Sequence, residues 1–255
     1  MKNAAITVLI SLLVSPLAWS EDHPRVGYFQ ETVTPLELLG EEGAKVISPI
    51  FPSDQKLTWQ LSVPENYDPT KPAGVMVFIG FAEWGGGKKV WKPVLEEKNI
   101  IWIGLIGGGD KNPLNERVMR ALLAQAVLER EYNIDLNRYY LFGYSGGAHV
   151  AAILATTKPE LFKGAIYYGD ALSWGRNVPP KIDLIKQNKF MFMAGSRDND
   201  VKDIRGVADA YREAGIINTE YSVIMNVGRE MPSVSYFEAA LEFIDSGVAV
   251  TKESE

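Results

Sequence analysis

The chain of 255 residues contains no cysteine. This absence excludes disulfide bonds, thiolate metal ligands and a cysteine nucleophile. Stability must therefore come from a buried core, and a chain of this length can form a sizeable core in one domain. Histidine is almost as scarce, because His23 and His149 are the only two in the sequence. Any imidazole base would have to be one of them.

An excess of positive charge is also absent. Lysine and arginine together number 26 against 32 aspartates and glutamates, which gives a formal net charge of −6. No predicted helix carries a stripe of lysine and arginine, so nucleic acid is not an expected partner. No cluster of His, Asp and Glu has metal-ligand spacing, and residues 107–111 (GGGDK) lack the spacing of a phosphate-binding loop. We expect neither a metal nor a cofactor.

Long apolar runs are missing except at the start of the chain. Lys2 precedes a nearly apolar stretch over residues 4–18, and Ala18-Trp19-Ser20 has small residues at the −3 and −1 positions of a cleavage site. This layout predicts a secretory signal over residues 1–20, because the run is shorter than the roughly 20 apolar residues of a membrane-spanning helix. Loss of Lys2 would change the net charge from −6 to −7. The mature protein is expected to be periplasmic or secreted, with no membrane attachment.

Strand-like and helix-like segments alternate through the rest of the chain. Apolar or alternating stretches predict strands over residues 56–63, 75–80, 100–106, 139–142, 165–168, 190–194 and 221–225. Helical spacing of apolar residues predicts helices over residues 114–132, 149–155, 203–214 and 235–243. This order predicts an α/β fold with a mainly parallel central sheet and helices on both faces. It forms a single domain over residues 21–246, in which residues 21–54 are either an extra strand or a wrapping arm, and residues 247–255 are expected to be a disordered tail.

The segment with the clearest chemical signature is Gly143-Tyr144-Ser145-Gly146-Gly147. It matches G-x-S-x-G, the sharp strand-to-helix turn that exposes a nucleophilic serine, and it lies between a predicted strand and a predicted helix as that motif requires. The N–H of Gly146 would lie at a helix N-terminus, where developing negative charge is stabilised. Ser145 is therefore a candidate nucleophile, and an incidental serine in a glycine-rich turn is the alternative.

Around this turn the chain resembles the α/β-hydrolase superfamily. Within it, the chain is most similar to the exported esterase and polyhydroxyalkanoate-depolymerase-like branch, which includes relatives of feruloyl esterases. The similar stretches cover nearly all of the chain from about residue 56 and are LTWQLSVPENYDPTKPAGVMVFI, YNIDLNRYYLFGYSGGAHVA, PELFKGAIYYGDA, FMFMAGSRDNDV and VGREMPSVSYFEAALEFID. The combination is specific to the superfamily and less specific to the branch. The resemblance implies the α/β-hydrolase fold and a serine carboxylic-ester hydrolase that acts on a small-molecule ester or a related ligand.

The resemblance also implies roles for individual residues. Ser145 would be the nucleophile, and the backbone N–H groups of Gly146 and of the loop near Phe81 would form the oxyanion hole. Asp198, which ends the stretch GSRD after a predicted strand, would be the acid of the triad, with Asp200 as the second choice. A solvated loop carboxylate is the alternative for both aspartates.

The histidine of the triad is missing from its expected place. In this fold the order along the chain is nucleophile, acid, histidine, so the histidine should follow the last strand. The chain has GREMP there, over residues 228–232, with Arg229 at the histidine position. A guanidinium has a pKa above roughly 12 and does not accept a proton. The placement of the loops predicts instead an ion pair between Arg229 and Asp198, which would close the site to proton transfer.

Five other residues are alternatives for the base, namely two histidines and three carboxylates. His149 lies one helical turn after Ser145 on the same helix face, although a helix carries that position away from the cleft. His23 is close to the predicted cleavage site. Glu230, Asp198 and Asp200 are carboxylates, and a carboxylate is a weak base for a serine hydroxyl unless burial raises its pKa.

Four side chains are candidates for lining the cleft. Trp84 and Trp91 follow the predicted strand over residues 75–80, where the resemblance places the oxyanion loop and part of the acyl pocket, and a position in the core is an equally good interpretation of both. Asp170 and Trp174 follow the predicted strand over residues 165–168. Ligands bind at the carboxyl ends of strands in sheets of this class.

These observations leave three functions open. The first is an exported ester hydrolase in which Glu230, His149 or another unconventional base activates Ser145. The second is a degenerate hydrolase that binds a ligand or a protein partner without turnover, and the third is acyl transfer with water excluded. Removal of a triad histidine lowers turnover roughly a millionfold. The rest of the site then still accelerates the reaction about a thousandfold over water. Weak or lost hydrolysis is therefore expected, and the sequence predicts neither the substrate nor the oligomeric state.

Overall fold

The computed structural model describes residues 24–87, 89–175 and 178–246. The predicted signal peptide, the predicted tail and His23 lie outside these residues. Within them, no helix is both long enough and apolar enough to cross a membrane.

An eight-stranded sheet runs through the described part of the chain in the order β1-β2-β4-β3-β5-β6-β7-β8. The bounds of its strands are β1 Gly27–Val33, β2 Leu57–Val63, β3 Ala73–Ile79, β4 Ile100–Leu105, β5 Ile134–Tyr144, β6 Gly164–Tyr168, β7 Lys189–Gly195 and β8 Thr219–Ile224. From β4 to β8, each strand is parallel to its neighbours in that order, whereas β2 is antiparallel to both β1 and β4. The prediction of a mainly parallel sheet is confirmed.

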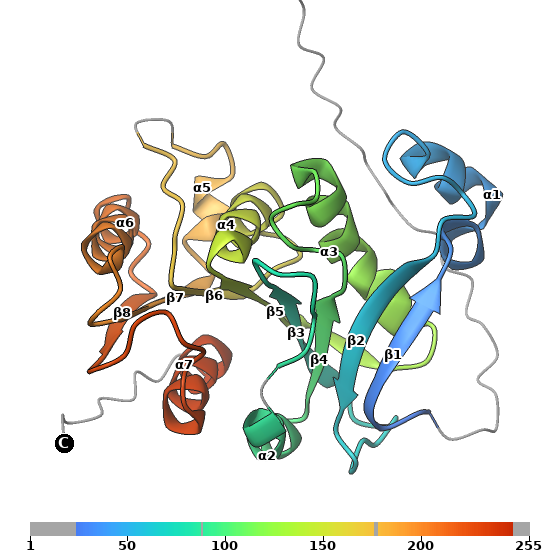
Figure 1. Ribbon diagram of the computed structural model, residues 1–255, viewed down its shortest axis with the longest axis horizontal. Helices are drawn as coiled ribbons and strands as arrows, with labels where there is room; N and C mark the ends of the chain where they lie inside the picture. Colours follow the sequence, from blue (N-terminus) through green and yellow to red (C-terminus); the bar gives the residue numbers. More distant parts are fainter. Residues whose placement is uncertain (1–23, 88, 176–177, 247–255) are drawn as a thin grey trace, which may run out of the picture.

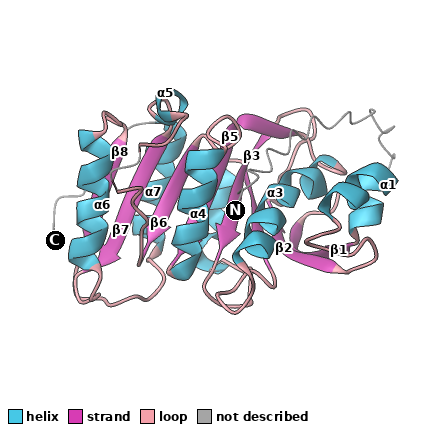
Figure 2. Ribbon diagram, turned by 90° about the horizontal axis from the view of Figure 1, so that it is seen from above, coloured by secondary structure: helices cyan, strands magenta, loops and turns pink. Residues whose placement is uncertain are grey.

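Helices cover both faces of this sheet. Their bounds are α1 Pro35–Ile47, the 3-10 helix η1 Lys89–Trp91, α2 Lys92–Glu97, α3 Leu114–Glu129, α4 Gly146–Thr157, α5 Ile182–Ile185, α6 Val201–Glu213 and α7 Val234–Ser246. Figure 1 shows α3, α4 and α6 on one face and α2 and α7 on the other, and Figure 2 shows the first group lying across the sheet. The predicted arrangement with helices on both faces is therefore present.

The segment of residues 21–54 contributes an extra edge strand and a helix. β1 pairs with β2 along its whole length. The helix α1 begins at a capping box, in which the Glu37 N–H donates to Thr34 Oγ1 and the Thr34 N–H donates to the Glu37 carboxylate. The sequence pattern does not predict this helix because Gly40, at φ +68°, interrupts it.

Two apolar layers hold the helices on the sheet. Every residue of β3 and β4 is buried, as expected for central strands that are covered on both faces. In the layer between the sheet and α7, the rings of Trp91 and Phe237 stack with centroids 4.3 Å apart and planes at 11°. Trp91 is fully buried, so the core interpretation of this tryptophan is confirmed.

Candidate functional site

The carboxyl ends of the parallel strands meet at one edge of the sheet. The loops after β3, β4, β5, β6, β7 and β8 carry, in that order, Phe81, Asp110, Ser145, Asp170, Asp198 and Arg229. This edge is where open α/β sheets bind their ligands. The fold thus brings together residues that are separated by up to 148 positions, since 229 − 81 = 148.

Ser145 lies at the sharp turn between β5 and α4. Its φ is +51° and its ψ is −129°, a conformation that costs a non-glycine residue energy and persists only when its surroundings enforce it. Part of that enforcement is a hydrogen bond of 2.8 Å from the Ser145 N–H to the Tyr168 carbonyl at the end of β6. The turn is therefore a nucleophile elbow in its geometry as well as in its sequence.

Two glycines allow the elbow to pack this tightly. A Cβ atom on Gly147 would lie 1.9 Å from the Ile79 carbonyl oxygen, and a Cβ on Gly143 would lie 2.5 Å from the Ala148 Cα. Real Cβ atoms do not approach backbone so closely. The pattern of glycines around Ser145 is thus required by the contact of α4 with β3 and β5.

Arg229 occupies the space between the acid and the serine. Its Nε donates to Asp198 Oδ2 at 2.9 Å and its Nη2 donates to Asp198 Oδ1 at 2.7 Å, which is a two-pronged ion pair. Nη2 also donates to Asp200, and Nη1 donates to Ser145 Oγ at 3.4 Å. The ion pair predicted for Arg229 and Asp198 is present.

This pair fixes the charge states around Ser145. The side chain of Asp198 is only 2% exposed, whereas that of Arg229 is 36% exposed. Burial alone would raise the pKa of Asp198, but hydrogen bonds from Arg229 and from the Asp200 N–H, together with the charge of Arg229, lower it overall. The same hydrogen bonds to Asp198 and Asp200 raise the pKa of Arg229. Among the described residues, Arg229 is the only side chain that is hydrogen-bonded to Ser145 Oγ.

The two N–H groups expected to form an oxyanion hole are those of Gly146 and Phe81. Within the described part of the chain, neither donates a backbone hydrogen bond. A carboxylate lies beside them, because a Cβ on Gly146 would lie 2.2 Å from Asp110 Oδ1, and the Asp110 N–H donates to the Phe81 carbonyl at 2.8 Å. Arg117 pairs with this carboxylate at 2.9 Å.

The solved structures with a similar fold include several esterases and an S-formylglutathione hydrolase. Est1E from Butyrivibrio proteoclasticus superposes with a TM-score of 0.55 at 12% identity, over 73% of this chain and 92% of that one. The S-formylglutathione hydrolase FrmB of Staphylococcus aureus gives 0.55 at 11% identity, over 90% and 99%. Esterase 2 of Thermogutta terrifontis, in its form phosphorylated by paraoxon, gives 0.54 at 17% identity, over 78% and 92%.

The chain has the α/β-hydrolase fold. At these identities the likeness shows the fold alone. No protein-family model matches the sequence, and no curated protein matches it. In the α/β-hydrolase fold, the histidine of a triad follows the nucleophile and the acid along the chain. In this chain the loop after the last strand, β8, carries Arg229.

Two tyrosines hold the loop between β8 and α7, which carries Arg229, in place. The Tyr144 hydroxyl donates to the Arg229 carbonyl, and the Tyr168 hydroxyl donates to the Glu230 carbonyl. Their rings stack with centroids 5.6 Å apart. Sequence reasoning did not single out either one, although Tyr144 lies inside the serine motif. The position of Arg229 is therefore set by strands β5 and β6 and not by its own loop alone.

The alternative bases Glu230 and His149 have contacts with groups other than Ser145. The Glu230 residue is exposed, and only its carbonyl is held, by Tyr168. His149 lies on α4, as expected from its spacing, with its Nε2 3.1 Å from Asp170 Oδ1. The hydrogen bond to Asp170 raises the pKa of His149 against the effect of partial burial. Across the described residues, no hydrogen bond joins either side chain to Ser145.

The remaining predicted cleft residues divide between surface and core. Trp84 is 44% exposed and its ring lies 5.6 Å from that of Phe78, between centroids. Trp174 packs against Tyr211 with centroids 4.3 Å apart, so it supports the core. Phe81 is 43% exposed and meets the Tyr144 ring edge-on at 5.3 Å. In the described part of the chain, no group of three or more His, Asp or Glu residues is arranged to hold a metal.

Proposed function

We propose that the protein is an α/β-hydrolase-fold protein of serine carboxylic-ester hydrolase descent whose ester hydrolysis is weak or lost. The observation that carries the proposal is the position of Arg229, which is hydrogen-bonded to Asp198 on one side and to Ser145 on the other. A triad needs at that point a group that takes the serine proton and then gives it to the leaving group. A guanidinium donates hydrogen bonds and does not accept the proton.

The expected loss is large. Removing the histidine of a serine triad lowers turnover by roughly a millionfold, and about a thousandfold acceleration over water remains from the oxyanion hole and binding. Asp198 does not replace the missing base. Its lowered pKa makes it a weak proton acceptor, and both of its carboxylate oxygens accept hydrogen bonds from Arg229. Residual hydrolysis would therefore be slow.

The surroundings of Gly146 support the same proposal. An oxyanion hole stabilises negative charge that develops on the substrate oxygen. Asp110 places a carboxylate against Gly146, and this charge opposes the development of a second negative charge nearby. The ion pair with Arg117 weakens this electrostatic repulsion, but the Asp110 carboxylate still cannot donate a hydrogen bond to the substrate oxygen.

A binding role without turnover is the second candidate. Ser145 is partly exposed, and the N–H groups of Gly146 and Phe81 make no backbone hydrogen bond to the described residues. These donors would hold the carbonyl of a small-molecule ester or a related ligand. Acyl transfer requires the same activation of Ser145 as hydrolysis does, so the position of Arg229 counts against it equally.

The test is hydrolysis of short and medium p-nitrophenyl acyl esters by the parent protein and by Arg229→His. The parent should not exceed Ser145→Ala. Arg229→His places an imidazole between Asp198 and Ser145 and should raise turnover by about tenfold or more, well short of the full millionfold. Parent turnover that equals or exceeds that of Arg229→His and disappears in Ser145→Ala would overturn the proposal.

Two control variants separate the imidazole from the loss of arginine. Arg229→Asn removes the guanidinium without supplying a base, so it should remain as inactive as the parent. Arg229→His combined with Ser145→Ala should lose whatever activity Arg229→His gained. Activity in both Arg229 variants would mean that arginine merely blocks access to the cleft.

We further propose that residues 1–20 direct export and are removed, on the basis of their sequence. Expression in a Gram-negative host followed by fractionation tests this proposal. Protein in the periplasm or the medium that begins at Glu21 is the expected result. Full-length protein retained in the cell would count against it.

A further inference from the structure

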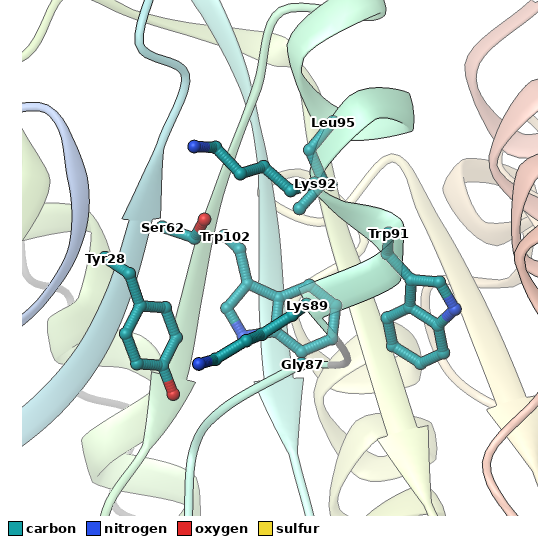
Figure 3. A pocket seen from close by; sticks show the side chains of 8 residues that line it. All are labelled: Tyr28, Ser62, Gly87, Lys89, Trp91, Lys92, Leu95 and Trp102. Atoms are coloured by element: carbon teal, nitrogen blue, oxygen red, sulfur yellow. The ribbon is translucent and has the colours of Figure 1, made fainter.

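A hollow lies beside residues 83–87 of the loop that follows β3. It consists of two adjoining parts of about 210 and 440 Å³, which share Tyr28 and Gly87. Figure 3 shows the smaller part, with Trp102 and Lys89 between Tyr28 and Trp91. A volume of this size is in the range of small-molecule sites. The proposed function gives this hollow no role.

The register of the sheet places the lining residues of β1, β2 and β4 next to one another. Tyr28 pairs with Ser62, and Ser62 pairs with Trp102, so the three residues form one row across β1, β2 and β4. Gln30, Gln60 and Gly104 form the next row. The helix α2 has only six residues and contacts β4, so it leaves the β1 and β2 part of this face uncovered (Figure 1).

Glycines in the loop fix the floor of the hollow. The Trp102 indole N–H donates to the Gly85 carbonyl at 2.9 Å. A Cβ on Gly86 would lie 2.4 Å from the Tyr28 hydroxyl, and a Cβ on Gly87 would lie 3.0 Å from the Trp102 ring. The loop therefore lies flat on the aromatic rings, which is possible only without side chains.

Polar acceptors in the hollow are held in fixed positions. Gln60 is 95% buried, from a relative exposure of 5%, and its Nε2 donates to the carbonyls of Phe29 at 2.6 Å and Leu61 at 3.2 Å. These two bonds orient the amide and leave Oε1 without a hydrogen-bond donor among the described residues. Glu83 is held in the same way, because the Asn112 side-chain amide donates to both of its carboxylate oxygens.

Two exposed aromatic side chains flank these acceptors. Tyr28 is 57% exposed on β1, and Trp84 is 44% exposed on the loop. Both residues line the larger part of the hollow together with Gln30 and Gln60. The charges around it are of both signs, with Glu83 in the larger part and Lys89 in the smaller, while Lys92 is already paired with Glu65 and Glu96.

We propose that this hollow binds a neutral oligosaccharide. A sugar ring has an apolar C–H face and hydroxyl groups at its edge. The face suits exposed Tyr and Trp rings, which are apolar with a polar tip, and the hydroxyls suit pre-oriented acceptors such as Gln60 Oε1. Charges of both signs favour an uncharged ligand over an acidic or a basic one. The site is separate from Ser145 and does not depend on whether esters are hydrolysed.

The test is isothermal titration of the purified protein with cellohexaose, xylohexaose and chitohexaose. We expect saturable binding of at least one of the three. Trp84→Ala and Tyr28→Ala should each weaken it by about tenfold or more, because aromatic contacts at the centre of a site carry much of the affinity. Both side chains are exposed, so neither substitution should change the melting temperature appreciably.

Controls distinguish this hollow from the cleft at Ser145. Phe81→Ala removes an equally exposed aromatic ring on the cleft side of the same loop, and Ile217→Ala removes an exposed apolar side chain elsewhere. Both variants should bind the sugar as the parent does. Absence of saturable binding to all three sugars, binding that survives both Trp84→Ala and Tyr28→Ala, or binding that Phe81→Ala abolishes would each overturn the proposal.

Discussion

Among single residues, Asp198 depends on Arg229 for its contribution to stability. The carboxylate of Asp198 is nearly buried, and it forms an ion pair with the partly exposed guanidinium of Arg229. Arg229→Met should lower the free energy of unfolding by about 2 kcal/mol. This figure is below the roughly 3–5 kcal/mol for breaking a fully buried pair, since one-third exposure of Arg229 weakens the interaction. Adding Asp198→Asn to Arg229→Met should recover part of the loss, as measured by urea unfolding.

A matched control for this cycle is Asp200→Asn. Asp200 also accepts a hydrogen bond from Arg229, but its side chain is 40% exposed. Its removal should change the free energy of unfolding by no more than about 0.5 kcal/mol. Equal losses in Asp200→Asn and Arg229→Met would show that burial of Asp198 is not the source of the coupling.

The pair of His149 and Asp170 predicts a dependence on pH. The hydrogen bond and charge of Asp170, helped by the charge of Asp110 and opposed by partial burial and Arg117, raise the pKa of His149. A raised pKa contributes stability that is fully present below the unfolded value of about 6.5 and is lost as pH rises through the folded value. Chemical unfolding should therefore show the parent more stable than Asp170→Asn at pH 5.5, with a smaller difference at pH 8. A difference that grows with pH would contradict this assignment.

Gly147 is critical at the scale of the elements, where α4 packs on β3. A Cβ at this position would lie 1.9 Å from the Ile79 carbonyl oxygen. Gly147→Ala should destabilise the protein by about 3 kcal/mol or more, or prevent folding, because backbone on both sides must move. Gly206→Ala in α6 is the control, since nothing lies within 4 Å of its added Cβ. It should be neutral or stabilise by up to about 1 kcal/mol in thermal unfolding; similar losses in both variants would refute the steric explanation.

The elements that the sequence predicts well are those whose own pattern decides their structure. β3 and β4 are continuous apolar runs, and the turn at Ser145 has its glycines in the motif. The helix α1 escapes prediction because Gly40 breaks its pattern, and β5 extends at its start beyond the predicted strand, from Ile134 through polar and exposed residues. The local sequence pattern thus does not predict an element whose structure depends on an edge contact or a kink.

The same division holds for the candidate site. Ser145, Asp198 and Arg229 are predicted together because each follows a strand at a motif position. Tyr144, Tyr168 and Asp110 are not, since their contacts with the Arg229 loop and with Gly146 arise only when the strand ends meet. When a side chain contacts a loop that is distant in the sequence, the residues next to it in the sequence do not reveal that contact.

The described part of the molecule has two different surfaces next to the loop from Phe81 to Gly87. One is the edge of parallel strands with Ser145, where Arg229 is hydrogen-bonded to Ser145 Oγ. The other is the open face of β1 and β2, with exposed aromatic rings and oriented amides. The two predictions, weak or lost hydrolysis at the first and sugar binding at the second, are independent of each other.

Ser145 is proposed to have no base, and its reaction with paraoxon tests this proposal. In this reaction Ser145 Oγ bonds to phosphorus, p-nitrophenolate leaves, and the serine proton must go to a base. Intact-mass measurement with peptide mapping should find the parent unmodified over a period in which Arg229→His gains one diethyl phosphate on Ser145. Rapid modification of Ser145 in the parent would contradict the account.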